Sequence, residues 1–229
     1  MFDLTGKTAL VTGANGALGR AVAARAAALG ASLLLADRGF AADVAARHPQ
    51  AWLLEIDLTE PSALAAALGD AGPVDALFNI AGGFAMGEAS YDPQGRDWDA
   101  MFRINVDTLR HSLRAVVPGM VAQGRGSIVN VGAMAALKGQ AGMSAYVASK
   151  SVVLRITESL SAEVRDRGVN VNAVLPSIID TPANRAAMPK ADPSRWVSPD
   201  DLANVICFLG SDAARAIHGA LVPVTGRVG

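Results

Sequence analysis

Short apolar runs recur along the chain, and each is bounded by glycine, proline or charged residues. Such runs are typical of buried strands, especially where valine, isoleucine and leucine dominate. Seven runs predict strands, at residues 8–12, 32–36, 51–56, 74–80, 127–131, 169–175 and 220–224. The stretches between them are mostly longer and rich in helix-forming residues. They predict helices at residues 20–29, 40–47, 59–68, 97–123, 144–167 and 200–209.

This alternation of strand and helix predicts the class of fold. Strands that alternate with helices form a parallel sheet with helices on both faces. We therefore expect an α/β, doubly wound (Rossmann-like) seven-stranded sheet in a single domain over residues 1–229.

Turn and cap signals add detail to this outline. Thr59-Glu60-Pro61 and Ser198-Pro199 each predict a helix start, because a hydroxyl cap precedes a proline in the first turn. Pro118-Gly119 predicts a bend or interruption in the longest helix. The segment at about 177–198 contains many Pro, Ala, Asp and Asn residues, and we predict that it is a mobile loop over the substrate.

Composition narrows the function classes. The chain is 51% hydrophobic and 18% charged with a net charge of -1, which favours a large core and gives nucleic-acid binding no basic surface. Cys207 is the only cysteine, so internal disulfides and thiolate metal clusters are excluded, and the three histidines show no ligand spacing. The N-terminal segment does not resemble a signal peptide, and no apolar run is long enough for a membrane span. We expect a soluble, cytoplasmic protein without a metal site.

A glycine-rich loop follows the first predicted strand directly. It places backbone N–H groups at the positive end of the next helix, where a pyrophosphate can bind. A tight turn would use the same glycines, so the loop alone does not decide. The candidate cofactor residues in it are Gly13, Asn15, Gly16, Ala17, Leu18 and Gly19.

An acidic residue, Asp37, ends the second predicted strand. A carboxylate about 20 residues beyond the glycines can accept hydrogen bonds from the ribose hydroxyls of NAD, and it would repel a 2′-phosphate. Arg38 beside it could bind that phosphate. The pair favours NAD(H) and leaves NADP(H) possible, and a strand-end turn is the alternative role for Asp37.

Further candidates lie where other strands end. The carboxyl ends of parallel strands form the ligand edge of an open α/β sheet. Asp57 and Leu58 follow the third strand, and the fourth ends in Asn79-Ile80-Ala81-Gly82-Gly83-Phe84. The small residues of this stretch allow a ligand to approach the backbone closely.

Tyr146 and Lys150 are four residues apart on a predicted helix and therefore share one face. A phenol has an ordinary pKa of about 10, and a neighbouring ammonium lowers it, which would make the pair a proton donor or acceptor. The alternative is a surface lysine beside a half-buried tyrosine. Asn105 lies inside another predicted helix, where asparagine is unfavourable. It is either solvent-facing or a buried polar group near the site.

Together these motifs resemble the short-chain dehydrogenase/reductase family over essentially the whole chain. The matching positions are Thr12-Gly13…Gly19, Asp57-Leu58, Asn79-x-Ala81-Gly82, Asn105, Tyr146-x-x-x-Lys150, and Pro176 followed by Thr181. The resemblance implies that Tyr146 is the general acid/base and that Lys150 lowers its pKa and holds the nicotinamide ribose. It also implies that Asn105 organises a water-linked proton relay, and that Pro176, Ile179 and Thr181 contact the cofactor.

The chain departs from that family at one position. The serine that usually orients the substrate carbonyl is replaced by Ala133, which follows Gly132. Loss of one such donor costs about 10²–10³ in rate elsewhere. Either the enzyme is weak on simple ketones, or its substrate does not need this donor.

Dihydropteridine reductase, one branch of the family, also carries Gly-Ala at this place. The chain is similar to it at residues 16–19, 81–84, 132–137 and 175–196. This similarity implies a planar substrate flanked by Phe84 and Trp196, near Ala133, and NADH-dependent reduction of a quinonoid dihydropterin.

Three functions therefore remain open. They are hydride transfer to or from a small carbonyl or conjugated substrate, the pteridine reaction, and a non-catalytic dinucleotide-binding sensor or scaffold. Family members pair the helices around Asn105 and Tyr146 into dimers and tetramers, so a homo-oligomer such as a homotetramer is expected.

Overall fold

The computed structural model describes residues 2–69 and 71–228. Its strands form one seven-stranded parallel sheet in the order β3-β2-β1-β4-β5-β6-β7. The strands are β1 (Thr8–Thr12), β2 (Ser32–Asp37), β3 (Trp52–Glu55), β4 (Ala76–Asn79), β5 (Gly126–Val131), β6 (Val169–Pro176) and β7 (Leu221–Val224). The predicted fold class is confirmed. The order reverses between β1 and β4, which is the topological switch point where such sheets bind ligands.

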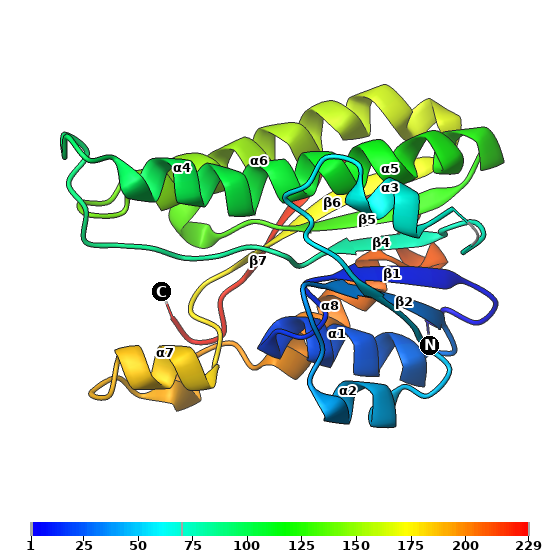
Figure 1. The fold of residues 1–229 in the computed structure, drawn as a ribbon, viewed down its shortest axis with the longest axis horizontal. Coiled ribbons are helices and arrows are strands. Elements are labelled where there is room, and N and C mark those ends of the chain that lie inside the picture. Colours follow the sequence, from blue (N-terminus) through cyan, green and yellow to red (C-terminus); the bar gives the residue numbers. More distant parts are fainter. Residues whose placement is uncertain (1, 70, 229) are drawn as a thin grey trace.

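Helices cover both faces of this sheet (Figure 1). One layer contains α1 (Ala17–Ala28), α2 (Ala42–Arg47) and α8 (Pro199–Leu209). The other contains α3 (Ala63–Ala67), α4 (Arg96–Phe102), α5 (Thr108–Gln123) and α6 (Ser144–Val164). The short helix α7 (Pro182–Ala187) lies apart from the two layers, near the C-terminal end of the chain in this view.

The strand sequences are apolar throughout because both sheet faces are buried. On β1, Ala9 and Val11 belong to the core under α1 and α8, whereas Leu10 belongs to the core under α3 and α5. All three are fully buried. Two apolar cores therefore fix the sheet between the layers and leave its carboxyl edge free for a site.

The longest predicted helix is interrupted at a different place from the one expected. The chain forms a π-helical segment at Arg103–Asp107, between α4 and α5, while α5 continues through Pro118. The Thr108 hydroxyl donates to the Ile104 carbonyl at 2.6 Å, which satisfies a carbonyl in the wider π turn. Pro118 and Gly119 are exposed, so water can pair the carbonyl that the proline ring leaves free.

The two predicted helix starts have different outcomes. The Ser198 hydroxyl accepts a hydrogen bond from the Asp201 amide at 3.0 Å, and this cap is confirmed. The prediction at Thr59 is wrong, because α3 begins only at Ala63. The Thr59 amide and hydroxyl donate to the Asp57 carboxylate at 2.9 and 2.8 Å instead.

The segment 177–198, which the sequence predicts to be a mobile loop, contains short regular elements. It contains α7 and a 3-10 turn at Pro193–Arg195. Its two ends are joined by a bridge between Ile179 and Val197, where the Val197 amide donates to the Ile178 carbonyl at 2.9 Å. The segment therefore includes a short helix, which Thr181 caps and Pro182 begins. Its mobility and its place over the substrate stay predictions.

Within residues 2–69 and 71–228, no helix combines the length and apolar character that a membrane crossing requires.

Candidate active site

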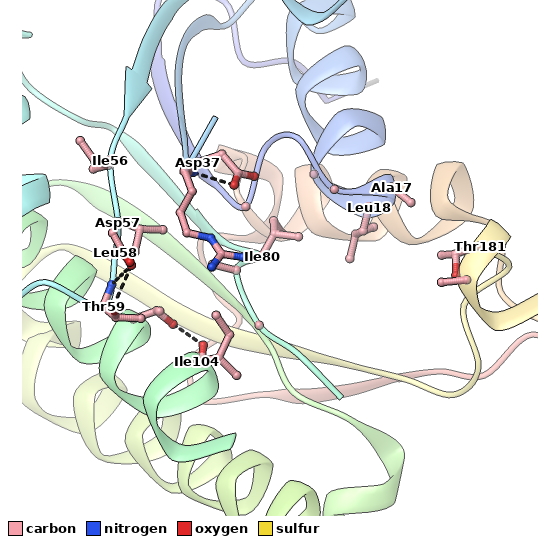
Figure 2. A pocket seen from close by; sticks show the side chains of 18 of the residues that line it. Ala17, Leu18, Asp37, Ile56, Asp57, Leu58, Thr59, Ile80, Ile104 and Thr181 are labelled. Carbon is pink, nitrogen blue, oxygen red and sulfur yellow. Dashed lines mark hydrogen bonds between the residues drawn. The ribbon is translucent and has the colours of Figure 1, made fainter. Parts of the chain in front are cut away.

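A groove of about 550 Å³ runs along the carboxyl ends of β1 to β4, at the switch point. Figure 2 shows Asp57 and Thr59 on one side of it and Leu18 and Thr181 on the other. The predicted residues that line it are Gly13, Gly16, Ala17, Leu18, Gly19, Asp37, Asp57, Leu58, Ala81, Gly82 and Thr181. Sequence reasoning therefore located most of one wall from strand ends and glycines.

The glycine loop fits a phosphate group. Gly13 has a φ of +66°, and a Cβ there would lie 2.8 Å from the Ala81 Cα, so only glycine lets the loop approach β4 so closely. Gly16 caps α1 without a side-chain hydrogen bond, and the first turn of α1 holds no acidic residue. The first amide N–H groups of this 12-residue helix therefore keep their capacity to bind an anion.

Asp37 and Arg38 place opposite charges at the far end of the groove, and both line it. The Asp37 carboxylate accepts hydrogen bonds from the Asn15 amide at 2.9 Å and the Arg38 amide at 2.8 Å, so it connects the glycine loop to β2. This end of the groove therefore offers a carboxylate and a guanidinium side by side to a ribose or its phosphate.

A second carboxylate, Asp57, lies in the same groove. Hydrogen bonds from Thr59, together with the charges of Arg38 and Arg103, hold the pKa of Asp57 below its usual value.

Two predicted cofactor residues support the groove instead of lining it. The Asn15 Oδ1 atom accepts hydrogen bonds from Arg20 at 2.7 Å and from the Ala41 amide at 3.2 Å. Asn79 is buried, donates to Asn130 Oδ1 at 2.9 Å and accepts from the Ser112 hydroxyl at 2.7 Å.

The predicted catalytic residues meet around the segment 82–84. Asn105 is buried; its Oδ1 accepts the Gly83 amide at 2.9 Å, and its Nδ2 donates to the Gly83 carbonyl at 3.1 Å. A Cβ at Gly82 would lie 2.7 Å from Asn105 Oδ1 and 3.2 Å from Lys150 Nζ. The ring of Phe84 packs edge-to-face on Tyr146, with centroids 4.8 Å apart. Because Gly82 also lines the groove, the groove and these residues adjoin.

The protonation of Tyr146 and Lys150 differs from the sequence expectation. Burial raises the pKa of Tyr146 to about 12, whereas the sequence predicted a lower value. Lys150 Nζ donates to the Val131 carbonyl at 2.9 Å, and burial lowers its pKa to about 8. Removal of both groups from water favours their neutral forms, and this desolvation is the largest cause at each.

The chain is closely packed at Gly132 and Ala133. Ala133 is buried, and a Cβ at Gly132 would lie 2.6 Å from Leu154 Cδ2. Leu154 therefore fills the volume that a side chain at position 132 would need.

The remaining predicted residues lie around the segment 177–198. Thr181 lines the groove and accepts the Asn184 amide at 3.2 Å. Pro176 ends β6 opposite Val224. Ile179 is held in the bridge to Val197. Trp196 is only 7% exposed and, like Phe84, lies outside the groove lining, so its place beside a substrate stays a prediction.

Sequence reasoning missed part of the groove wall. Ile104 and Thr108 share one face of the helical segment that carries Asn105, and this spacing is the signal that could have found them. The lining residues that were not predicted are Ile56, Thr59, Ile80, Ile104, Thr108, Pro182 and Ala183.

Comparisons with known proteins agree with this geometry. The family model described as short chain dehydrogenase matches residues 7–192. Galactitol 2-dehydrogenase (L-tagatose-forming) of Cereibacter sphaeroides is 34% identical over 99% of this chain and 96% of its own length. The 2,5-dichloro-2,5-cyclohexadiene-1,4-diol dehydrogenase LinX of Sphingobium indicum is 30% identical over 97% and 96%.

A solved structure shows the same arrangement. Gluconate 5-dehydrogenase from Burkholderia cenocepacia J2315, in complex with NADP and tartrate, superimposes with a TM-score of 0.90 at 28% identity, over 99% of this chain and 96% of that one. The family model covers most of the chain, and the curated relatives cover nearly all of it. This chain therefore belongs to the short-chain dehydrogenase family and is an oxidoreductase.

Proposed function

We propose that the chain transfers hydride between NAD(P)(H) and a small carbonyl or conjugated substrate, with Tyr146 as the general acid/base. The observation that carries this proposal is the contact at Gly82. Gly82 lines the groove and lies against Asn105 and Lys150. A dinucleotide bound along the groove would therefore place one of its ends beside these two residues. The galactitol and cyclohexadiene-diol dehydrogenases named above each take an alcohol as substrate, according to their names. This supports an alcohol and a carbonyl compound as the substrate and product of this chain.

The groove residues fit the cofactor part by part. The amino end of α1 would hold the pyrophosphate, and Asp37 the adenosine ribose. Asp57 and Leu58 would border the adenine, and Lys150 would donate to the nicotinamide ribose. When bound, the reduced nicotinamide supplies the hydride that the carbonyl carbon receives.

Tyr146 completes the reduction by proton transfer. Because burial holds its pKa at about 12, the phenol is protonated near neutrality and is ready to donate. As the carbonyl oxygen gains negative charge, the Tyr146 O–H bond breaks and the proton moves to that oxygen. Lys150, with a pKa of about 8, is mostly charged at pH 7 and stabilises the phenolate that remains.

Replacement of Tyr146 by phenylalanine tests this role. We expect Tyr146→Phe to lower kcat by about 10²–10⁴-fold, the usual contribution of a general acid, while the Kd for NADH changes little. Tyr91 is the only other tyrosine and is 89% exposed, so Tyr91→Phe is a matched control that keeps full activity. Equal kcat in wild type and Tyr146→Phe would exclude the acid/base role.

We propose that NAD(H) is preferred over NADP(H). Each oxygen of the Asp37 carboxylate accepts one backbone amide and keeps lone pairs for the ribose hydroxyls. Arg38 beside it supports NADP(H) as a second cofactor, and the gluconate 5-dehydrogenase structure contains NADP. Asp37→Ala should lower the ratio of kcat/KM for NADH to that for NADPH, and a wild-type preference for NADPH would contradict the proposal.

The absence of a hydroxyl at Ala133 favours a second candidate, NADH-dependent reduction of a quinonoid dihydropterin. Such a conjugated ring depends less on a single carbonyl donor. A third candidate is a dinucleotide-binding sensor without catalysis. NADH consumption with a quinonoid dihydropterin, with a dicarbonyl, and with neither distinguishes the three, because a sensor binds NADH but consumes none.

We further propose that copies of the chain associate through α5 and α6. The outer faces of these helices form a hollow of about 450 Å³ whose lining includes Leu113, Val152, Ile156 and Leu160. Exposed apolar hollows of this kind are typical of protein interfaces. The organisation as one domain over residues 1–229, the role of 177–198 as a substrate loop and the cytoplasmic location stay predictions.

A further inference from the structure

Exposed apolar side chains gather on the two segments that flank Tyr146. Among residues 2–69 and 71–228, five large hydrophobic residues are exposed, and four of them lie after β4 or β5. They are Phe84 (55% exposed), Met86 (62%), Tyr91 (89%) and Leu137 (55%). The fifth, Trp52, lies on the edge strand β3. Exposed apolar groups that cluster in this way mark interaction sites, and ligand-binding grooves are among them.

These two segments also lack polar side chains where they leave the sheet. Residues 81–87 read AGGFAMG and residues 131–137 read VGAMAAL. Apart from the weakly accepting sulfur atoms of Met86 and Met134, none of these side chains can donate or accept a hydrogen bond. The first polar side chains that follow are Glu88 on one segment and Lys138 on the other.

Both segments are attached to the beginning of α6, on which Tyr146 lies. Phe84 packs on the Tyr146 ring, and the Gly87 amide donates to the Gly142 carbonyl at 2.7 Å. On the other segment, the Ala136 carbonyl accepts the Ser151 hydroxyl at 2.9 Å. Met86 therefore lies between two residues that contact this region, Phe84 and Gly87. Leu137 directly follows Ala136, which is hydrogen-bonded to α6.

Several polar groups near these segments are already paired. Ser90 and Ser144 hydrogen-bond to each other. Glu88 accepts the Asp97 amide at 3.1 Å. Ser149 donates to the Tyr146 carbonyl at 2.8 Å and accepts from Asn105.

Polar side chains of the segment 177–198 are also paired with each other or with the backbone. Asn184 donates to the Ile179 carbonyl at 2.8 Å, and Arg185 forms a two-point ion pair with Asp180 at 2.6 and 2.7 Å. The hydroxyl groups of a sugar, or the ring N–H groups of a pterin, would find few free partners here and would lose their hydrogen bonds to water.

We propose that Phe84, Met86 and Leu137 recognise an apolar ring next to the reacting carbonyl. The substrate class is then a cyclic or aryl ketone without hydroxyl groups near the carbonyl, or the corresponding alcohol. This inference rests on the proposed function, and it selects against polyhydroxylated ketones and against the pterin alternative.

The test compares substrates and variants in the full-length enzyme, with NADH and with NADPH. The probes are 1-tetralone, an aryl ketone, and dihydroxyacetone, a small polyhydroxylated ketone. We expect kcat/KM for 1-tetralone to exceed that for dihydroxyacetone by about 100-fold, because an apolar surface favours apolar groups and leaves hydroxyls unpaired.

Alanine variants test which of these side chains contact the substrate. Met86→Ala and Leu137→Ala should each raise KM for 1-tetralone by about tenfold, with kcat and the pH profile nearly unchanged, because neither side chain is placed against Tyr146. Phe84→Ala should do the same and should also shift the pH profile, since it exposes Tyr146. Trp52→Ala removes a comparably exposed apolar residue on β3 and should leave both substrates unaffected.

The outcomes separate this inference from the function beneath it. Preference for dihydroxyacetone or for a quinonoid dihydropterin, with Met86→Ala and Leu137→Ala equal to wild type, would overturn the inference and leave hydride transfer standing. Absence of turnover with every carbonyl and both cofactors would overturn the proposed function, and the inference with it.

Discussion

At the scale of single residues, burial governs the ionisation of the proposed proton-transfer pair. Tyr146 and Lys150 are both withdrawn from water, and this desolvation moves their pKa values to about 12 and about 8. Both pKa values lie above 7, so at pH 7 the phenol of Tyr146 is neutral and the amine of Lys150 is mostly charged. That combination favours donation of a proton to a carbonyl oxygen.

The pKa of Lys150 predicts a pH dependence of stability. Its pKa is about 8 in the fold and 10.5 ordinarily, so between these values the unfolded chain binds more protons and the free energy of unfolding rises with pH. Urea unfolding should show wild type gaining about 2 kcal/mol relative to Lys150→Met between about pH 8 and 9.5. The opposite effect of Tyr146, whose raised pKa lowers stability as pH rises, begins only above its ordinary value of 10.

Lys138→Met provides the control for this measurement. Lys138 is exposed, so its replacement should leave the pH slope of wild type intact. Parallel curves for wild type and Lys150→Met would show that Lys150 is not desolvated in the fold.

Ala133→Ser restores the hydroxyl that the family usually has. If the substrate oxygen lies beside Ala133, the new donor should raise kcat/KM for a simple aliphatic ketone by about 10²-fold. Steady-state rates with cyclohexanone measure this gain. Ala135→Ser adds the same hydroxyl two residues away and should have little effect, so equal gains in both variants would refute a specific role for position 133.

At the scale of elements, a buried chain of polar side chains joins α5 to α6 through the sheet. Ser112 on α5 donates to Asn79 on β4, Asn79 donates to Asn130 on β5, and Asn130 donates to Thr157 on α6 at 2.9 Å. All four side chains are buried. The network fixes α6, which carries Tyr146 and Lys150, at one distance from α5, which directly follows the segment that carries Asn105.

Asn130→Ala should destabilise the fold strongly. The Asn79 amide and the Thr157 hydroxyl would each lose a buried partner, at a combined cost of about 3 kcal/mol measured by urea unfolding. In the double variant with Thr157→Val, the second change should cost less than Thr157→Val does alone, because its partner is already gone. Additive effects of the two changes would mean that the two residues act independently.

Much of this architecture follows from local patterns. The strand runs, the Ser198 cap and the glycine loop are fixed by nearby residues, so sequence alone identified them. The π-helical segment around Asn105 was missed because a one-residue bulge leaves almost no change in apolar periodicity. The pairing of Asn79 with Asn130 and the burial of Trp196 depend on contacts between distant parts of the chain, which periodicity does not encode.

At the scale of the whole molecule, the hollow between α5 and α6 is the apolar surface that a second copy can cover. Arg155 and Glu163 lie at its border, eight residues apart on α6, with Ser159 midway. In the proposed two-fold, antiparallel pairing of α6 about Ser159, each Arg155, which pairs with Glu158 of its own helix at 2.9 Å, would also face the Glu163 of the other copy. Such a pairing would add charge complementarity to the apolar contact.

Ile156→Glu tests this assembly. Ile156 lines the hollow and is half-buried in the single chain, so a carboxylate there should dissociate the oligomer by placing charge in an apolar interface while the fold remains intact. Size-exclusion chromatography with light scattering should give wild type a mass of two or more times 23.4 kDa, the mass of one chain. The variant should have the mass of a single chain. Trp52→Glu adds the same charge at an exposed apolar residue on β3 and should leave the mass of wild type unchanged. A monomeric wild type, or an oligomer that Ile156→Glu does not disturb, would show that copies do not associate through this hollow.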